Sequence, residues 1–195
     1  MKTTVVREKD IIVSKWAGGE SKQYYIYPPE SSYASRNFLF RVSMATSYND
    51  EEAKYTNLEN FTRYLIMLEG TAQVFHKNYY DITLNPYENI DVFDGGWESS
   101  ASGKVVDFNL MTSKNIAANM TVMDKSDSIK IDYELRKKNW LIFFCGYGSA
   151  TFELANCERI SILKNDLIIF EDIENNKEIN VKLYDSKLVK MFVSL

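Results

Sequence analysis

Leu65-Ile-Met-Leu-Glu-Gly70 and Leu141-Ile-Phe-Phe-Cys-Gly146 are the two segments that decide the fold of this chain. Each is an apolar run that ends in glycine, and each is followed by a run that ends in phenylalanine, Ile82–Phe93 and Ile160–Phe170. The two glycines lie 76 positions apart (70 and 146) and the two phenylalanines lie 77 apart (93 and 170). A near-constant offset along both stretches indicates an internal duplication. The sequence therefore predicts two similar small β units in tandem.

The alternation of side chains along the chain is also typical of β-strands. Side chains alternate in character over 38–45, 63–68 and 105–110, which is the period of a strand, and Gly, Pro, Asn and Asp separate the runs. No long window shows the 3.6-residue period of a helix. We therefore expect an all-β protein in which two tandem cupin-like β-barrels of the RmlC-like jelly-roll type form a compact bicupin. The barrels would span residues 1–115 and 116–195, with the option that N-terminal strands cross to the other barrel.

The composition is that of a folded domain rather than of a disordered chain or a nucleic-acid binder. The 195 residues are 45% hydrophobic and 26% charged, and the net charge is −4 with a pI near 5.2. A dedicated nucleic-acid binder needs a basic face. The segment 1–15 lacks the apolar core of a signal peptide, and the longest apolar run, Trp140–Cys145, is too short to span a bilayer. We expect a cytoplasmic protein that contacts neither nucleic acid nor membrane, with both cysteines reduced.

The histidine content bears on the metal sites that cupin barrels often carry. Metal-binding cupins hold their ion with two or three imidazoles and a carboxylate, because the cation needs several converging ligands. This chain contains one histidine, His76, so such a site cannot form within it. We expect His76 to be a surface residue of a strand. Nucleotide-binding glycine loops and nucleophile motifs are also absent, and the sequence predicts no metal and no cofactor.

Polar residues on the predicted strands are the first candidates for function. Arg41 and Ser43 share one face of a strand, Asp107 and Asn109 share one face of another, and Arg63 begins a third. One interpretation is that these faces meet water, as in many antiparallel sheets. In a barrel, however, the second face lines the interior, where two arginines would suit a carboxylate. An Arg–Asp pair that only stabilises the fold is equally compatible with the pattern.

Two segments that contain paired glycines add candidate pocket walls. Trp16-Ala-Gly-Gly19 and Phe93-Asp-Gly-Gly-Trp97 allow positive φ angles and close approach of the backbone. A tryptophan beside such a turn can form the wall of a pocket. Taken alone, each segment is better explained as a plain turn clamped by an aromatic ring.

These segments, in this order, resemble the HutD/Ves family. The resemblance rests on Trp16–Gly19, Arg41–Ala45, Arg63 leading to Leu68–Gly70, and the long run Phe93–Met111. It implies a compact bicupin without a metal. Some relatives are encoded with histidine-utilisation genes, and a role in binding a pathway intermediate or in limiting the pathway has been suggested for them.

The resemblance also implies a ligand site in the first barrel. The residues that carry over from the family are Trp16, Gly18, Gly19, Arg41, Ser43, Arg63, Asp94, Asp107 and Asn109. Gln23 and Phe93 complete the predicted site. Gln23 stands where the family often has a carboxylate. This difference changes the local charge by one, so the identity of the ligand does not carry over from the family.

Three functions remain open on the sequence alone. The first is a regulatory protein of amino-acid (histidine) utilisation that binds a small anionic metabolite, a carboxylate, in the first barrel. The second is a metal-free enzyme that acts on a small carboxylate with Asp107 or Asp94 as the base, although an aspartate beside arginine should be too acidic for this. The third is a structural or protein-interaction module, with a homodimer as one form. We favour the first and assign no catalytic residue.

Overall fold

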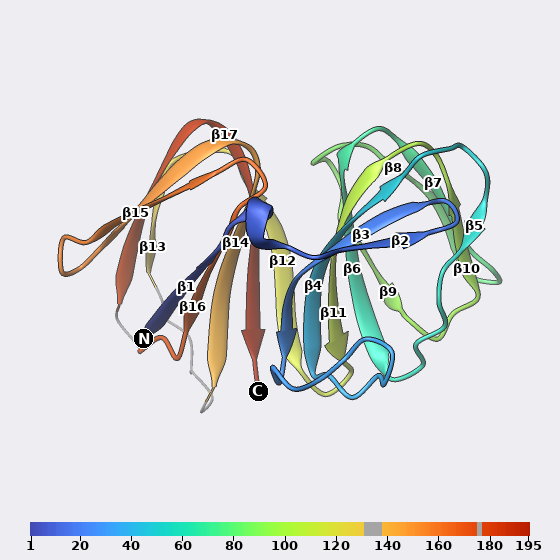
Figure 1. Ribbon diagram of the computed structural model, residues 1–195, viewed down its shortest axis with the longest axis horizontal. Coiled ribbons are helices and arrows are strands. Elements are labelled where there is room, and N and C mark those ends of the chain that lie inside the picture. Colours follow the sequence, from blue (N-terminus) through green and yellow to red (C-terminus); the bar gives the residue numbers. More distant parts are fainter. Residues whose placement is uncertain (131–137, 175–176) are drawn as a thin grey trace. The chain divides into compact units, whose positions relative to one another are not determined.

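The computed structural model describes residues 1–130, 138–174 and 177–195 of the chain. Apart from one short 3-10 helix, η1 (Glu8–Asp10), the regular elements of these residues are β-strands, which confirms the predicted all-β class. The described residues include no helix that is long and apolar enough to cross a membrane. They form two compact units (Figure 1). The N-terminal unit comprises residues 11–115, and the C-terminal unit comprises residues 116–195 together with residues 1–10.

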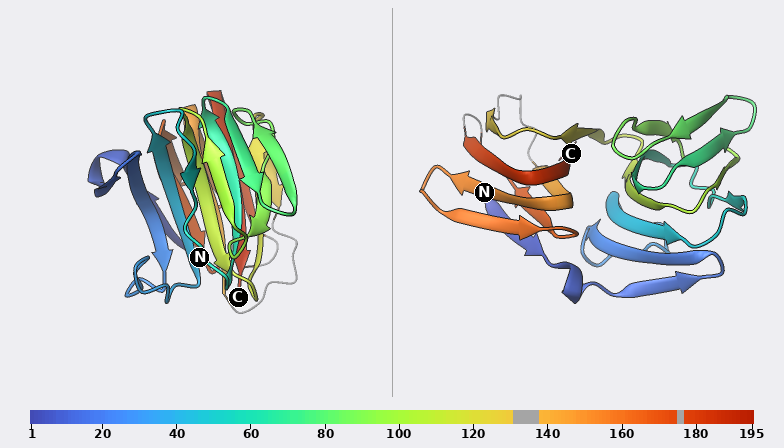
Figure 2. Two further views of the ribbon diagram at one scale, coloured as in Figure 1. Left: turned by 90° about the vertical axis from the view of Figure 1, so that its right-hand side faces the viewer. Right: turned by 90° about the horizontal axis from the view of Figure 1, so that it is seen from above.

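The described residues of the N-terminal unit form two antiparallel sheets. In spatial order, the large N-terminal sheet consists of β2 (Val13–Trp16), β3 (Gly19–Tyr27), β4 (Phe40–Ser47), β11 (Val106–Ser113), β6 (Phe61–Glu69) and β9 (Asp91–Asp94). The small N-terminal sheet consists of β5 (Ala53–Lys54), β10 (Ser99–Ser102), β7 (Ala72–His76) and β8 (Tyr80–Leu84). Figure 2 shows the β2–β3 hairpin, in blue, at the edge of the large sheet.

The described residues of the C-terminal unit form one antiparallel sheet. Its main path consists of β1 (Lys2–Val6), β16 (Leu167–Glu171), β14 (Asn139–Leu154), β17 (Glu178–Ser194) and β12 (Ala117–Met123), while β13 (Asp127–Lys130) pairs with β17 and β15 (Arg159–Leu163) pairs with β14. The strand orders of all three sheets have two open ends. Among the described residues, the pairing therefore shows open sheets rather than the closed barrels that the sequence predicted.

The internal repeat corresponds to equivalent strand pairing in the two units. In the N-terminal unit β6 pairs with β9 and β11, and in the C-terminal unit β14 pairs with β16 and β17. Gly70 has a φ of +74°, and the C-terminal residue with the matching conformation is Gly148, at +68°, rather than Gly146. A Cβ at position 148 would lie 2.0 Å from the carbonyl oxygen of Asp185, so only glycine fits there. The glycine that matches Gly70 therefore lies two residues later than the repeat predicts, within β14 where its register shifts.

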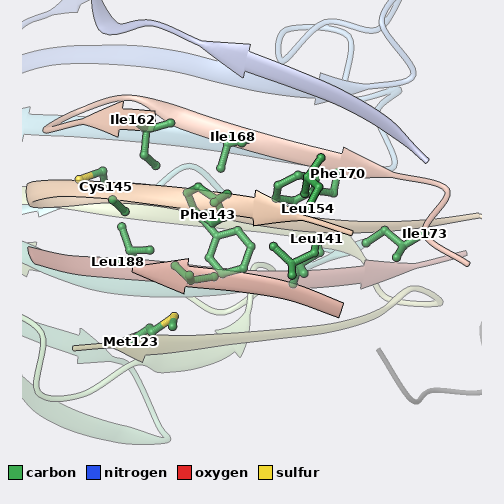
Figure 3. Packing of buried hydrophobic residues seen from close by; sticks show 14 residues of the cluster. Met123, Leu141, Phe143, Cys145, Leu154, Ile162, Ile168, Phe170, Ile173 and Leu188 are labelled. Atoms are coloured by element: carbon green, nitrogen blue, oxygen red, sulfur yellow. The ribbon is translucent and has the colours of Figure 1, made fainter. Parts of the chain in front are cut away.

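The two units have interiors of different character. The C-terminal cluster is wholly apolar, and Phe143, Phe152 and Phe170 lie at its centre with ring centroids 4.9 to 6.2 Å apart. Figure 3 shows Phe143 and Phe170 among the other side chains of this cluster. Both units also bury some polar side chains, but the buried Asp166 of the C-terminal unit pairs with Arg7, whereas the N-terminal unit buries two arginines, Arg41 and Arg63. Because buried charges are costly in a dry interior, they mark the N-terminal unit as the place to look for a site.

Candidate functional site

The candidate site lies on one face of the large N-terminal sheet, which we call the inner face. Arg41 on β4 is opposite Met111 on β11, and Met111 is opposite Arg63 on β6. Residues that are directly opposite in an antiparallel sheet share a face, so these three form one row. The next row on the same face contains Ser43 and Asn109. Strand register thus brings four of the predicted site residues to one surface.

Arg41 is held by uncharged partners. Its Nε donates to Gln23 Oε1 and its Nη1 donates to Ser43 Oγ, both at 2.8 Å, and its guanidinium lies 4.6 Å from the centre of the Tyr33 ring. The residue is 8% exposed, and no described carboxylate forms an ion pair with it. Burial is the largest cause that lowers the pKa of Arg41, and the positive charge of Arg63 acts in the same direction. Arginine stays protonated even so, and its charge is not neutralised by these partners.

Arg63 is buried between aromatic rings, and its Nε has no polar partner among the described residues. Its guanidinium lies 4.5 Å from the centre of the Tyr55 ring and 5.2 Å from that of Phe93, and the residue is 5% exposed. Its Nε has no hydrogen-bond partner among the described residues, and none of their carboxylates forms an ion pair with it. Ring faces offset part of the cost of burying this charge, but they accept no hydrogen bond of ordinary strength. Within the described part of the chain, Arg63 Nε therefore lacks the acceptor that a buried guanidinium normally has.

Asp107 lies on the same face and is not paired with either arginine. Its cross-strand neighbours are Ala45 and Met67. It keeps some contact with solvent, but desolvation raises its pKa to about 7, while Arg63 acts in the opposite direction. The expectation that an aspartate beside arginine is too acidic for a base is wrong for Asp107, because it forms no contact of ion-pair length with Arg41 or Arg63 and desolvation raises its pKa.

Ala17 and Gly18 form the turn of the β2–β3 hairpin, and Trp16 and Gly19 are the paired residues on either side of it. A Cβ at Gly18 would lie 2.3 Å from Trp16 Cζ3, and a Cβ at Gly19 would lie 1.8 Å from the carbonyl oxygen of Thr46. The tryptophan packs on its own hairpin and is 42% exposed. These contacts are those of a turn clamped by an aromatic ring, which was the simpler of the two interpretations.

Asp94 lies apart from the arginines. Arg63 is opposite Phe93, so Asp94, the next residue along β9, belongs to the other face of the sheet. Its carboxylate accepts hydrogen bonds from the Gly96 backbone N–H at 2.8 Å and from Lys114 Nζ at 2.6 Å. Burial acts against these bonds, but together they lower the pKa of Asp94. This residue stabilises a turn, and it is not placed to act as a base in the site.

Sequence reasoning missed the two tyrosines that cover the arginines. Tyr33 precedes β4 and Tyr55 precedes β6, both outside the long strands. Residues in irregular segments have no periodicity from which their direction can be inferred. The available signal was composition, since 13 tyrosines are many for a chain of this length.

His76 is buried at 1% exposure, so the prediction of a surface residue is wrong. Its Nδ1 lies 2.7 Å from Ser99 Oγ and its Nε2 lies 2.8 Å from Asp91 Oδ2. The hydroxyl of Tyr80 donates to the other carboxylate oxygen of Asp91 at 2.7 Å. The imidazole also contacts Phe93, with ring centroids 4.3 Å apart. The network joins β7 of the small sheet to β9 of the large sheet beside the ring that covers Arg63.

Other places in the described chain are less suited to an anion. No group of three His, Cys, Asp or Glu side chains within 1–130, 138–174 and 177–195 is placed to hold a metal. A cavity of about 310 Å³ in the C-terminal unit has Glu158, Glu174 and Glu178 in its lining. Lys177, also in that lining, pairs with Glu174 at 3.4 Å. The cavity is therefore predominantly acidic, whereas the inner face of the large N-terminal sheet is cationic.

Comparison with known families identifies the relationship of this chain. The family model described as HutD matches residues 8–188. The chain belongs to the HutD family. This confirms the resemblance that the sequence motifs indicated. None of the curated protein sequences matches the chain.

Several solved structures share the fold of this HutD-family chain. A conserved protein of unknown function from Pseudomonas aeruginosa is 14% identical over 100% of both chains, with a TM-score of 0.85. HutD from Pseudomonas fluorescens is 16% identical over 97% of this chain and 98% of its own, with a TM-score of 0.77. A cupin 2 conserved barrel domain protein from Leptotrichia buccalis is 13% identical over 98% and 96%, with a TM-score of 0.58. At these identities the likeness concerns the fold, which is cupin-like.

Proposed function

We propose that the N-terminal unit of this HutD-family protein binds a small anionic metabolite, a carboxylate, on the inner face between Arg41 and Arg63. The observation that carries the proposal is Arg63, whose buried guanidinium has an unpartnered Nε and no carboxylate in ion-pair contact among the described residues. A buried cation without a counter-charge is unfavourable. A bound carboxylate would accept hydrogen bonds from the guanidinium in the forked geometry that arginine favours.

The charges around the inner face support an anionic ligand. Arg41 and Arg63 contribute two positive charges, and Gln23, which accepts the hydrogen bond from Arg41 Nε, is neutral. Asp107, with its pKa raised to about 7, contributes at most one negative charge near neutral pH. These three side chains therefore carry a net positive charge of one to two, and Asp91, which lies on the same face, is hydrogen-bonded to His76 and Tyr80. In a largely desolvated region such a charge attracts an anion more strongly than it would in water.

The metabolic role that we propose is regulatory binding in histidine utilisation. Family membership supports this role, as does the shared fold with HutD from Pseudomonas fluorescens, which was described in a formate condition. The ligands to be tried are therefore small carboxylates: urocanate, formylglutamate, glutamate and formate. Each carries the carboxylate that the arginines can recognise.

Arg63→Gln is expected to raise the Kd of the bound carboxylate about 100-fold or more. Hydrogen bonds to a charged group contribute about 1.5–3 kcal/mol each, and two of them would be lost. The melting temperature without ligand should change little or rise, because the variant removes a buried charge that has no partner in the described structure. Thermal shift and isothermal titration calorimetry with the four acids measure both quantities. Arg159→Gln is the control, since Arg159 is an exposed arginine of the C-terminal unit.

Two results would contradict the proposal. One is that none of the four acids binds the wild-type protein. The other is that Arg63→Gln binds as well as the wild type but is much less stable, which would mean that Arg63 serves the fold. Arg159→Gln should behave as the wild type in both measurements.

Asp107 supports a second candidate function, a metal-free enzyme that acts on the same small carboxylates. A general base is most effective when its pKa lies near the working pH, and the pKa of Asp107 is raised to about 7. Turnover of the four acids, followed by nuclear magnetic resonance, is then expected with wild-type protein and should fall at least about 100-fold in Asp107→Asn. Asp94→Asn should keep the wild-type rate. Absence of turnover by the wild type would leave binding as the function.

A further inference from the structure

Asp107 is a carboxylate on the inner face with no hydrogen-bond partner among the described residues, so its negative charge would oppose a bound anion. We propose that the site takes up its carboxylate together with one proton, which Asp107 carries, so that binding weakens as the pH rises. This proton-coupled binding rests on the carboxylate site of the proposed function. It makes the protein a binder whose affinity follows the pH of its surroundings.

The position of Asp107 explains why it would accept a proton. It lies four residues from Met111 on β11, so its Cα is about 13 Å along the strand from the row of the two arginines. Its neighbours across the sheet, Ala45 and Met67, have side chains without a hydrogen-bond donor. No described side chain or backbone N–H donates to its carboxylate. Desolvation without hydrogen bonds favours the neutral acid.

Other groups near Asp107 leave it as the proton acceptor of the site. The titratable or charged groups that share the inner face or pack against it are Arg41 (β4), Arg63 (β6), His76 (β7), Asp91 (β9) and Tyr55 (the segment before β6), and β6 ends in the exposed Glu69. On the same face, β3 contributes the uncharged Ser21, and β10 contains no titratable residue. The arginines stay charged, burial raises the pKa of Tyr55 so that it stays neutral, and His76 and Asp91 are bonded to each other.

A bound carboxylate would shift Asp107 further toward its neutral form. It would add a negative charge on the same face as Asp107, and it would engage the positive charge of Arg63 that favours the ionised form. Both effects raise the pKa of Asp107 in the complex above its value of about 7 in the free protein. By linkage, affinity is highest below pH 7, where Asp107 is already protonated, and it falls above pH 7, where binding must take up a proton.

The test is calorimetric titration of the wild-type protein with formate and with glutamate between pH 6 and pH 8.5. Cationic buffers, Tris and triethanolamine, avoid competition from buffer anions, and their different ionisation enthalpies reveal how many protons are taken up. We expect the Kd to be level up to about pH 7 and then to rise by up to about tenfold per pH unit. Proton uptake should be greatest between pH 7 and the higher pKa that Asp107 has in the complex, and it should not exceed one per ligand.

Two matched variants test whether Asp107 is the group that carries the proton. Asp107→Asn keeps the shape of the side chain and cannot ionise, so its Kd should be level across the range and lower than that of the wild type at pH 8.5. Asp94→Asn should keep the wild-type slope, because Asp94 belongs to the other face and pairs with Lys114.

Each outcome has a distinct meaning. Binding with a level Kd in the wild type would overturn the proton coupling and leave the carboxylate site intact. A slope that persists in Asp107→Asn would also overturn it, because another group would then carry the proton. Absence of binding of both acids at every pH, including pH 6, would overturn the carboxylate site itself and the coupling with it.

Discussion

Replacing His76 with alanine is expected to lower the free energy of unfolding by about 3–5 kcal/mol. The imidazole is buried, and its Nε2 lies 2.8 Å from Asp91 Oδ2. Its removal would leave the buried Asp91 carboxylate with Tyr80 as its remaining side-chain partner among the described residues. It would also leave a cavity between β7 and β9. Urea denaturation followed by circular dichroism measures the loss.

A double variant separates the charge effect from simple packing. His76→Phe combined with Asp91→Leu removes both polar groups and fills the space, and it should recover most of the lost stability, since neither partner is then left buried alone. Ser99→Ala removes one hydroxyl at the other ring nitrogen and should cost about 1 kcal/mol. A loss below about 1 kcal/mol in His76→Ala would show that the network does not hold the two sheets together.

Phe143→Ala is expected to lower the free energy of unfolding of the C-terminal unit by about 3–5 kcal/mol. Phe143 is 0% exposed, and its ring lies 4.9 Å from that of Phe152 and 6.2 Å from that of Phe170. The loss combines the transfer of an aromatic ring to water with the cavity that remains among closely packed neighbours. Differential scanning calorimetry measures it and also shows whether unfolding occurs in one transition or in two.

Phe143→Leu is the matched control for this core. Leucine keeps most of the apolar volume, so its cost should stay well below that of alanine. Equal losses for leucine and alanine would mean that ring shape rather than volume determines the stability of the cluster. A loss below about 1 kcal/mol for alanine would contradict the close packing on which the prediction depends.

The His76 network also bears on the candidate site. Phe93 contacts the imidazole at 4.3 Å between ring centroids, and the Arg63 guanidinium lies 5.2 Å from the centre of the same Phe93 ring. His76 therefore supports the ring that covers Arg63 and acts on the arginine only through it. His76 is thus a positioning residue that lies behind the site.

Some features of this protein were determined by local pattern alone. Alternation along 38–45 and 105–110 placed Arg41 and Ser43 on one face and Asp107 and Asn109 on another, and the strand register shows these faces to be one surface. The period of a strand is two, so which residues share a face can be read without a structure. The all-β class and the family motifs could also be predicted from the sequence, because both depend on residues that lie close together in the chain.

Other features depended on contacts between residues far apart in the sequence. Tyr33 and Tyr55 reach the arginines from irregular segments, and His76 finds Ser99 and Asp91 on two other strands. The pKa of Asp107 depends on how far it lies from Arg63 and on how much protein surrounds it, and neither quantity is written in the order of the residues. The sequence by itself determined which side chains share a strand face. Only the tertiary structure decided which of them are paired, which are buried without a partner, and therefore where a ligand would be held, because burial and pairing arise when separate strands come together.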